Sequence, residues 1–187
     1  MKHKTIEHKI RKKDGEKNLK ERCEFLAKTI KIIRRLYKQA TPNQKQFIET
    51  IIGAAIWYLP KKANQYWTHC ISRDALRNHL PNIKAKPKLT EDHAYPRKLA
   101  AEKLLKLNKI NAGKIVRLYK KQFGVFNLIT PEENRKLMPF QRKGNYINWK
   151  DAYKKAGIKL YRNVSVIELN RIKNRDRKTI DRILHGR

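Results

Sequence analysis

Apolar residues recur at spacings of three and four over residues 18–39 and again over residues 42–58, which predicts two amphipathic helices. Thr41-Pro42 is a typical helix start, and Pro60 marks the end of the second helix. We expect these two helices to pack as an antiparallel pair. Similar spacings and start signals predict shorter helices over residues 73–80, 97–109, 114–122, 131–137 and 149–156, and from residue 164 onward.

The best candidate for a strand is the apolar run Val125–Ile129, which follows Gly124. Thr130 comes directly after this run and begins a helix, with Pro131 in its first turn and two acids at its positive end. Many helices and few strands together predict a helix-rich α+β fold.

Composition and break signals divide the chain into four segments. We expect a flexible basic arm over residues 1–17, with a break at Asp14-Gly15, and an N-terminal helical region over residues 18–88. Residues 89–140 form a central segment that contains the strand, and residues 141–187 form a C-terminal basic helical segment. A length of 187 residues suggests one compact domain with appended helices.

The charge of the chain points to its partner. It carries 47 Lys and Arg against 16 Asp and Glu, a formal net charge of +31. The excess is spread along the sequence, so the folded body itself is expected to be basic. Such a molecule repels itself unless a polyanion is nearby. Nucleic acid is the polyanion that this charge favours, because phosphate contacts release counterions, and an anionic membrane surface is a weaker alternative.

Several classes of protein are excluded. No run of about 18 apolar residues occurs, so no transmembrane helix is predicted, and the beginning Met1-Lys2-His3-Lys4 has no apolar stretch typical of a secretory signal. Cys23 and Cys70 lack CxxC spacing and cannot by themselves form a disulfide framework or a zinc cage. We therefore expect a cytoplasmic protein with no membrane partner.

Acids are scarce in this sequence, so the cluster Glu91-Asp92-His93 is informative. A carboxylate such as Asp92 can hold a divalent cation, and a histidine such as His93 can take a proton from water. Neighbouring side chains on a strand point to opposite faces, so the two residues can share one task only at a strand end or bend. The alternative is a surface turn in which Asp92 caps the following helix.

A second block lies downstream, where Asn134 falls in the first turn of the helix that follows the strand. Its amide oxygen is a hard ligand that suits Mg²⁺. The segment TEDHAYPR over residues 90–97, together with NLITPEENRKL over residues 127–137, resembles the HNH nucleases, which have a ββα-metal fold. The resemblance is closest in style to the HNH endonucleases encoded by phages.

This resemblance implies a small ββα-metal centre over residues 89–140, embedded among basic helices. Asp92 and Asn134 would hold one Mg²⁺ or Mn²⁺ against the scissile phosphate. His93 would be the general base that activates water, and Asn127 would orient the His93 ring. The metal would stabilise the transition state and the leaving oxygen. DNA, in duplex form, would be the substrate, contacted through basic residues that include Arg97, Lys98, Arg135 and Lys136.

Two other functions remain open at this stage. The first is a nucleic-acid-binding protein without catalysis, which has no need for Asp92, His93 and Asn134 to meet. The second is a protein whose basic surface docks an acidic protein, and its binding would be indifferent to nucleic acid. If the chain is a nuclease that cuts both strands, one small centre would usually require a homodimer.

Overall fold

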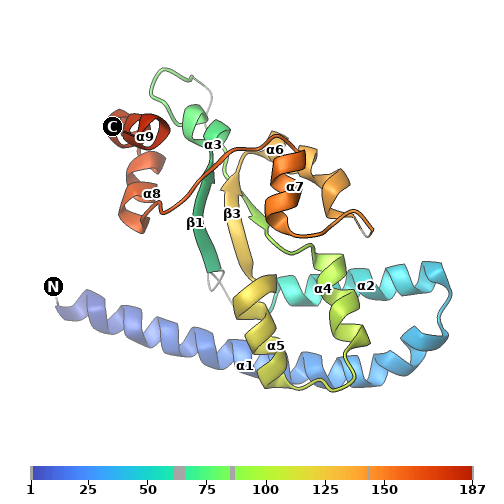
Figure 1. Cartoon of the computed structure of the whole chain (residues 1–187). Helices are drawn as coiled ribbons and strands as arrows, with labels where there is room; N and C mark the ends of the chain where they lie inside the picture. The colour runs from blue at the N-terminus through green and yellow to red at the C-terminus, as the bar shows by residue number, and fades with distance from the viewer. Residues whose placement is uncertain (1, 61–65, 85–86, 143, 187) are drawn as a thin grey trace. The chain divides into compact units, whose positions relative to one another are not determined.

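The computed structural model describes residues 2–60, 66–84, 87–142 and 144–186, with side chains from Glu16 onward within these ranges. The predicted helix-rich α+β fold is confirmed (Figure 1). The chain forms two compact units, Met1–Tyr66 with Tyr95–Val125, and Trp67–Ala94 with Phe126–Arg187. These units divide the chain differently from the expected segments, whose boundaries lie at 88/89 and 140/141. Each unit is assembled from parts that are distant in sequence. Local composition does not indicate contacts between such distant parts.

The first unit is built from helices. They are α1 (Lys2–Gln39), α2 (Pro42–Trp57), α4 (Arg97–Lys106), α5 (Ala112–Leu118) and a π-helical turn, η1 (Tyr119–Phe123). Helix α2 packs against α4, and α1 packs against α5. The predicted helices are confirmed, although α4 ends earlier than expected. Helices α4 and α5 lie in the segment expected to form the nuclease centre. They instead pack with α1 and α2 in the core of the first unit.

The predicted arm over residues 1–17 is wrong for the described part of that segment. Helix α1 runs without interruption from Lys2 to Gln39, through the break expected at Asp14-Gly15. A single glycine inside a helix costs only about 1 kcal/mol relative to alanine. The neighbouring Lys and Glu residues are good helix formers, so this local cost does not stop the helix.

The predicted pairing of the first two helices is confirmed. Thr41 caps α2, and its hydroxyl accepts a hydrogen bond from the Gln44 backbone N–H while the Gln44 side chain accepts from the Thr41 N–H. The Tyr37 hydroxyl donates to the buried carboxylate of Glu49 over 2.7 Å and so joins α1 to α2. Gly53 brings α2 close to α4, because a Cβ atom there would lie 3.2 Å from the Arg97 carbonyl oxygen.

The second unit is organised around a four-stranded sheet in the order β2-β3-β1-β4. The strands are β1 (Tyr66–Ser72), β2 (Thr90–His93), β3 (Val125–Ile129) and β4 (Leu160–Tyr161). Strands β2 and β3 are antiparallel, as are β1 and β4, whereas β1 and β3 run in the same direction in Figure 1. Strand β3 was predicted. Strands β1 and β4 were not, and β1 falls inside the segment expected to be helical.

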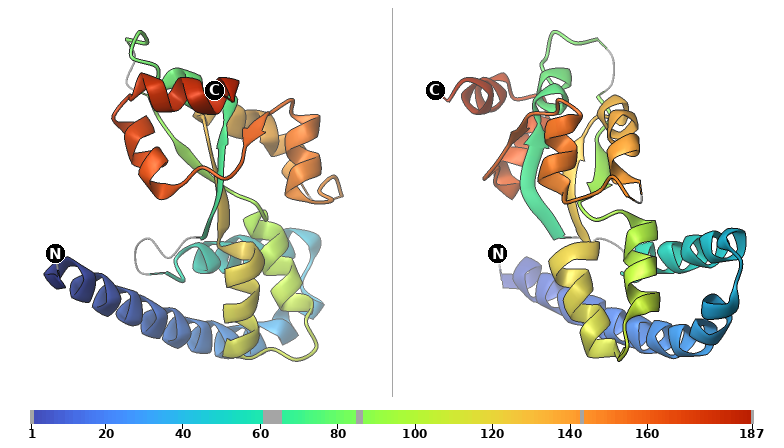
Figure 2. Two further views of the ribbon diagram at one scale, coloured as in Figure 1. Left: turned by 60° about the vertical axis from the view of Figure 1, so that its left-hand side comes forward. Right: turned by 45° about the vertical axis from the view of Figure 1, so that its right-hand side comes forward.

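Helices cover both faces of this sheet (Figure 2). One face carries α3 (Arg73–Asn78), α8 (Val166–Lys173) and α9 (Arg177–His185), and the other carries α6 (Pro131–Leu137), a 3-10 turn, η2 (Met138–Gln141), and α7 (Trp149–Lys155). Side chains on alternate strand positions therefore enter two separate cores. The first core contains Ile71, Leu76, Phe126, Leu128, Ile172 and Ile180, and the second contains Ile129, Leu137, Ala152 and Tyr153.

The structure also bears on membrane-spanning helices and on the two cysteines. Among the described residues, no helix combines the length and apolar character needed to cross a bilayer. Cys23 and Cys70 are both buried free thiols, and burial raises the pKa of Cys23 to about 12. A thiol in such surroundings stays protonated and unreactive at neutral pH.

Candidate functional site

Asp92 lies on β2 and is almost fully buried, with 6% of its surface exposed. Its two carboxylate oxygens accept hydrogen bonds from different partners. The Gln141 side-chain amide donates to Oδ1 over 3.0 Å, and the Tyr153 hydroxyl donates to Oδ2 over 2.6 Å. Burial raises the pKa of Asp92, and the bonds from Gln141 and Tyr153 oppose that rise. The carboxylate is therefore held in one orientation by two neutral groups.

Asn127 lies directly opposite Asp92 in the antiparallel pair of β2 and β3. Residues opposite each other in such a pair project from the same face of the sheet. Asn127 is completely buried, and its Oδ1 accepts a hydrogen bond of 2.5 Å from the Thr68 hydroxyl on β1. The structure thus brings together two of the predicted site residues and adds Thr68 to them.

His93 occupies the next position on β2, opposite Phe126. Because neighbouring strand residues project from opposite faces, the register directs Asp92 and His93 to different sides of the sheet. His93 is buried, with 7% of its surface exposed, and its Nε2 atom is inaccessible to solvent. His93 ends the strand, and the bend follows it at Ala94 and Tyr95. Its role as the base beside Asp92 stays a prediction.

The helix that carries Asn134 forms as predicted. Thr130 caps α6, and its hydroxyl accepts from the Glu133 N–H while the Glu133 carboxylate accepts from the Thr130 N–H. The same carboxylate accepts a 2.5 Å bond from the Ser72 hydroxyl at the end of β1. These buried bonds fix the start of α6 against the sheet, and α6 contacts β2.

Asn134 itself lies one residue further along α6 and is half-buried. Among the described residues, no hydrogen bond links its side chain to Asp92, and the joint role of the two as metal ligands stays a prediction. The order of the elements nevertheless matches the expected one. Two antiparallel strands, β2 and β3, are followed by the helix α6, which packs on β2.

The four predicted nucleic-acid contacts are all exposed on helices. Arg97 and Lys98 begin α4 in the first unit, and the Arg97 guanidinium lies 4.8 Å from the centre of the Trp57 ring. Arg135 and Lys136 lie on α6 in the second unit, where Arg135 pairs with Glu132 over 3.1 Å. An exposed pair within one helix contributes little to stability, so Arg135 stays available for a phosphate.

The donor set around Asp92 suits a hard divalent cation. Asp92 offers carboxylate oxygens and Asn134 an amide oxygen, both of which Mg²⁺ accepts. The protein partners of the Asp92 carboxylate are an amide and a phenol, which leave its negative charge uncompensated. A buried charge of this kind is stabilised by a cation. No group of three or more His, Cys, Asp or Glu that suits a metal occurs in the described ranges, so the set depends on amide oxygens.

Sequence reasoning missed three residues of this site, Thr68, Gln141 and Tyr153. Tyr153 comes from α7, and burial together with the charge of Asp92 raises its pKa well above the usual value. Gln141 and Thr68 belong to segments with no local signal that would mark them. The distance in sequence between Asp92 and its partners explains why they were missed.

Comparison of the chain with protein-family models, with curated proteins and with solved structures gives no match. The resemblance to the HNH nucleases therefore stays a prediction from the two sequence blocks.

Proposed function

We propose that this protein binds DNA and hydrolyses its phosphodiester bonds at a centre formed by β2, β3 and α6. The observation that carries the proposal is the pairing of Asp92 with Asn127 across two antiparallel strands, followed by a helix that bears Asn134. A chain with a net charge of +31 supplies the attraction for phosphate that such an enzyme needs.

Each residue of the centre has a role in this proposal. Asp92 and Asn134 hold Mg²⁺ or Mn²⁺, which supplies Lewis-acid stabilisation of the charge that develops on the phosphate. Tyr153 and Gln141 orient the Asp92 carboxylate through their hydrogen bonds. Asn127 was expected to orient the His93 ring, but the strand register places it on the face that carries Asp92, where Thr68 fixes it. His93 accepts the proton of the attacking water, which requires its ring to reach the face that carries Asp92.

The proposal extends to partner and compartment. Duplex DNA is the substrate, and Arg97, Lys98, Arg135 and Lys136 contribute phosphate contacts. We place the protein in the cytoplasm, that of a host cell if the chain is encoded by a phage. A homodimer would serve cleavage of both strands, whereas a monomer would nick one strand at a time.

The first test measures conversion of supercoiled plasmid to nicked or linear DNA in Mg²⁺, in Mn²⁺ and in EDTA. We expect metal-dependent conversion by the wild type and a loss of about 100-fold or more in Asp92→Asn. Glu91→Gln is the matched control, because Glu91 is an exposed acid at the adjacent strand position, on the other face. His93→Ala should abolish cleavage and change DNA affinity only a few-fold. His69 is an exposed histidine of the same unit, and His69→Ala should change neither cleavage nor affinity.

A second measurement reads metal binding without activity. Mg²⁺ at 100 times its dissociation constant should stabilise the wild type and Glu91→Gln by about 2.7 kcal/mol, and Asp92→Asn much less. Equal stabilisation of all three proteins would remove Asp92 from the metal site.

Non-catalytic binding of nucleic acid is the second candidate. The burial of the His93 ring and the two hydrogen bonds to the Asp92 oxygens favour it, because both residues then serve the fold alone. This candidate predicts gel retardation of DNA with no cleavage under any metal. It also predicts that His93→Ala lowers the free energy of unfolding, with no cleavage activity to lose.

A further inference from the structure

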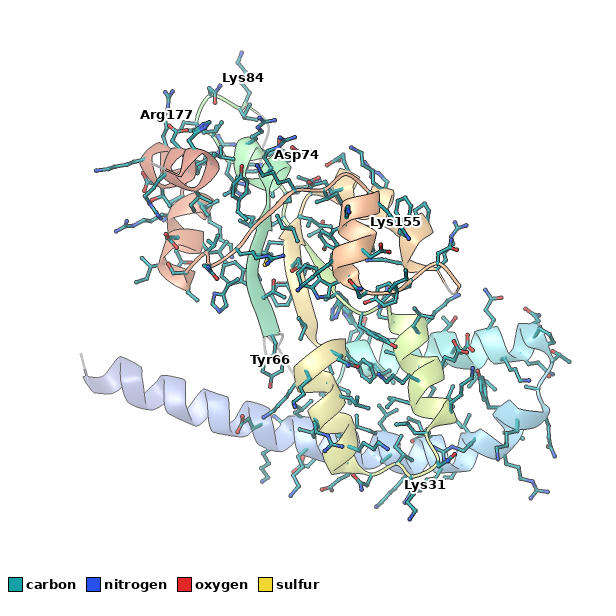
Figure 3. The ribbon with its side chains drawn as sticks, in the orientation of Figure 1. Lys31, Tyr66, Asp74, Lys84, Lys155 and Arg177 are labelled. Atoms are coloured by element: carbon teal, nitrogen blue, oxygen red, sulfur yellow. The ribbon has the colours of Figure 1, made fainter. Side chains whose placement is uncertain are left out.

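A basic cavity lies within the second unit, away from the residues assigned above. Its volume is about 560 Å³, which is in the range of pockets that take small ligands. It is lined by His79 at the end of α3, by Lys84, Pro87 and Leu89 from the segment between α3 and β2, and by Lys173 and Arg175 at the end of α8. Figure 3 labels Lys84 at this end of the unit.

The lining combines three positive charges with a small apolar wall. Lys84, Lys173 and Arg175 supply the charges, and the described lining residues include no acid. One acid, Glu91, interacts with this group of charges: burial raises the pKa of its carboxyl, and the charge of Lys173 opposes that rise. One acid against three cations leaves the cavity with a positive potential, which favours an anion.

Arg175 holds a backbone conformation that a side chain other than glycine rarely adopts. Its φ is 59°, in the left-handed region. Its N–H donates to the Ile172 carbonyl over 2.8 Å, and the N–H of Asp176 donates to the Arg171 carbonyl over 3.0 Å. These two bonds form the Schellman motif that ends α8, in which this position is usually glycine. The side chain of Arg175, at a position that suits glycine, lines the cavity.

His79 adds a neutral polar group to the same cavity. Its Nδ1 lies 2.7 Å from the Ala75 carbonyl, which can only accept, so Nδ1 carries the proton. Burial lowers the pKa of His79, and the charges of Arg175 and Lys173 lower it further. A bound anion would offset these two charges and raise that pKa, so His79 reports on the occupant of the cavity.

We infer that this cavity binds a phosphate group of bound DNA, with Lys84, Lys173 and Arg175 contacting the phosphate and Pro87 and Leu89 packing against the attached sugar. The inference rests on the DNA-binding part of the proposed function. It is independent of cleavage, because no lining residue belongs to the centre around Asp92.

The test uses the full chain in EDTA, so that no cleavage occurs. The pKa of the His79 ring is measured by NMR, with His79→Gln to assign the signal and His69 as internal reference. A short DNA duplex, a nucleoside 5′-monophosphate and inorganic phosphate are the three ligands. We expect the duplex to raise the pKa of His79 more than that of His69, and the monophosphate and inorganic phosphate to act only at much higher concentration.

Arg175→Gly is the decisive variant, because glycine suits this backbone and the fold should survive. Asn163→Gly is the matched control, since Asn163 is exposed, has a φ of 63° and does not line the cavity. We expect Arg175→Gly to abolish the His79 response and to reduce the slope of log K against log salt for the duplex by about 1. Asn163→Gly should behave as the wild type. The double variant of Lys84→Ala and Lys173→Ala should reduce the slope by about 2.

The outcomes separate the inference from the function on which it depends. If the wild type does not bind the duplex at all, the proposed function fails and the inference fails with it. If the duplex binds but His79 does not respond, or responds equally in Arg175→Gly, only the inference is overturned. A response to free monophosphate at low concentration, with none to the duplex, would also overturn it, because the cavity would then serve a free nucleotide.

Discussion

Asp92 shows how one residue can carry both a structural and a chemical role. Its carboxylate is buried against a phenol and an amide, and neither carries a charge. A buried carboxylate without a cation favours its protonated form, so the fold itself binds a proton here more tightly than the unfolded chain does. The same lack of a positive partner is what a divalent cation would supply.

The first prediction follows from the raised pKa of Asp92. Such a group contributes stability that is fully present below its unfolded pKa, near 3.8, and that is lost as pH rises through its folded pKa. Asp92→Asn removes this loss. The free energy of unfolding of the variant, relative to the wild type, should therefore increase as pH rises from about 3.8 and then level off. Urea unfolding of both proteins at a series of pH values, without metal, measures this difference in free energy. A difference that does not change with pH would contradict the prediction.

Helix caps connect the elements of this fold, and they differ in how deeply they are buried. Ser72 caps α3, accepting from the Ala75 N–H over 3.1 Å, and also donates to the Glu133 carboxylate that caps α6. One hydroxyl thus fixes the starts of two helices on the sheet. Ser165 caps α8 in the same way through Glu168, but it is exposed to solvent.

The second prediction compares these two caps. Ser165→Ala should cost about 1 kcal/mol, the usual value for an exposed cap. Ser72→Ala should cost about 2–4 kcal/mol, because it removes a cap and also leaves the buried Glu133 carboxylate with one donor fewer. Chemical denaturation of both variants measures the difference. Equal losses would mean that the bond between Ser72 and Glu133 adds nothing to stability.

A third prediction concerns the continuity of α1. Gly15→Ala should increase helix content and stabilise the protein by up to about 1 kcal/mol, whereas Gly15→Pro should end the helix near this point. Far-ultraviolet circular dichroism and amide hydrogen exchange over residues 2–20 provide the measurement. Identical spectra for both variants would restore the interpretation of this segment as a flexible arm.

Features set by neighbouring residues were predictable at the scale of elements. Thr41 and Thr130 each cap a helix as predicted, because a cap depends on a hydroxyl and the next three residues. Strand β1 was not predicted, since its sequence YWTHCIS has no clear alternation, and its bonds come from β3 and β4, more than 50 residues away. In the site, the family resemblance marked Asp92 and Asn127 as functional residues but did not predict that they pair across two strands. Gln141 and Tyr153 lie too far along the chain to be marked by any local pattern.

At the scale of the whole molecule, charge is the dominant property. The described ion pairs are mostly between exposed side chains close in sequence, and they leave most of the basic residues without an acidic neighbour. Each unit contains its own hydrophobic core, so stability does not require the basic surface to be neutralised. The positive charge is therefore available for a partner.

The fourth prediction is that DNA affinity falls steeply with salt. Each neutralised phosphate contributes about −0.9 to the slope of log K against log salt, so a footprint of six or more phosphates gives a slope of about −5 or steeper. Fluorescence anisotropy with a labelled duplex between about 50 and 400 mM salt measures it. Weak binding of DNA, together with tight binding to acidic proteins, would favour a docking protein instead.

The path of the chain between its two units has a consequence for the order of folding during synthesis. The first unit is complete once residue 125 has been made, whereas the sheet needs strands on both sides of that point. Strands β1 and β2 are made early, but they are not neighbours, because β3 lies between them. Until β3 emerges, both have unpaired edges, which invite pairing with other chains. The growing protein thus depends on its own positive charge to keep these two strands apart from other molecules until residues 125–129 are made.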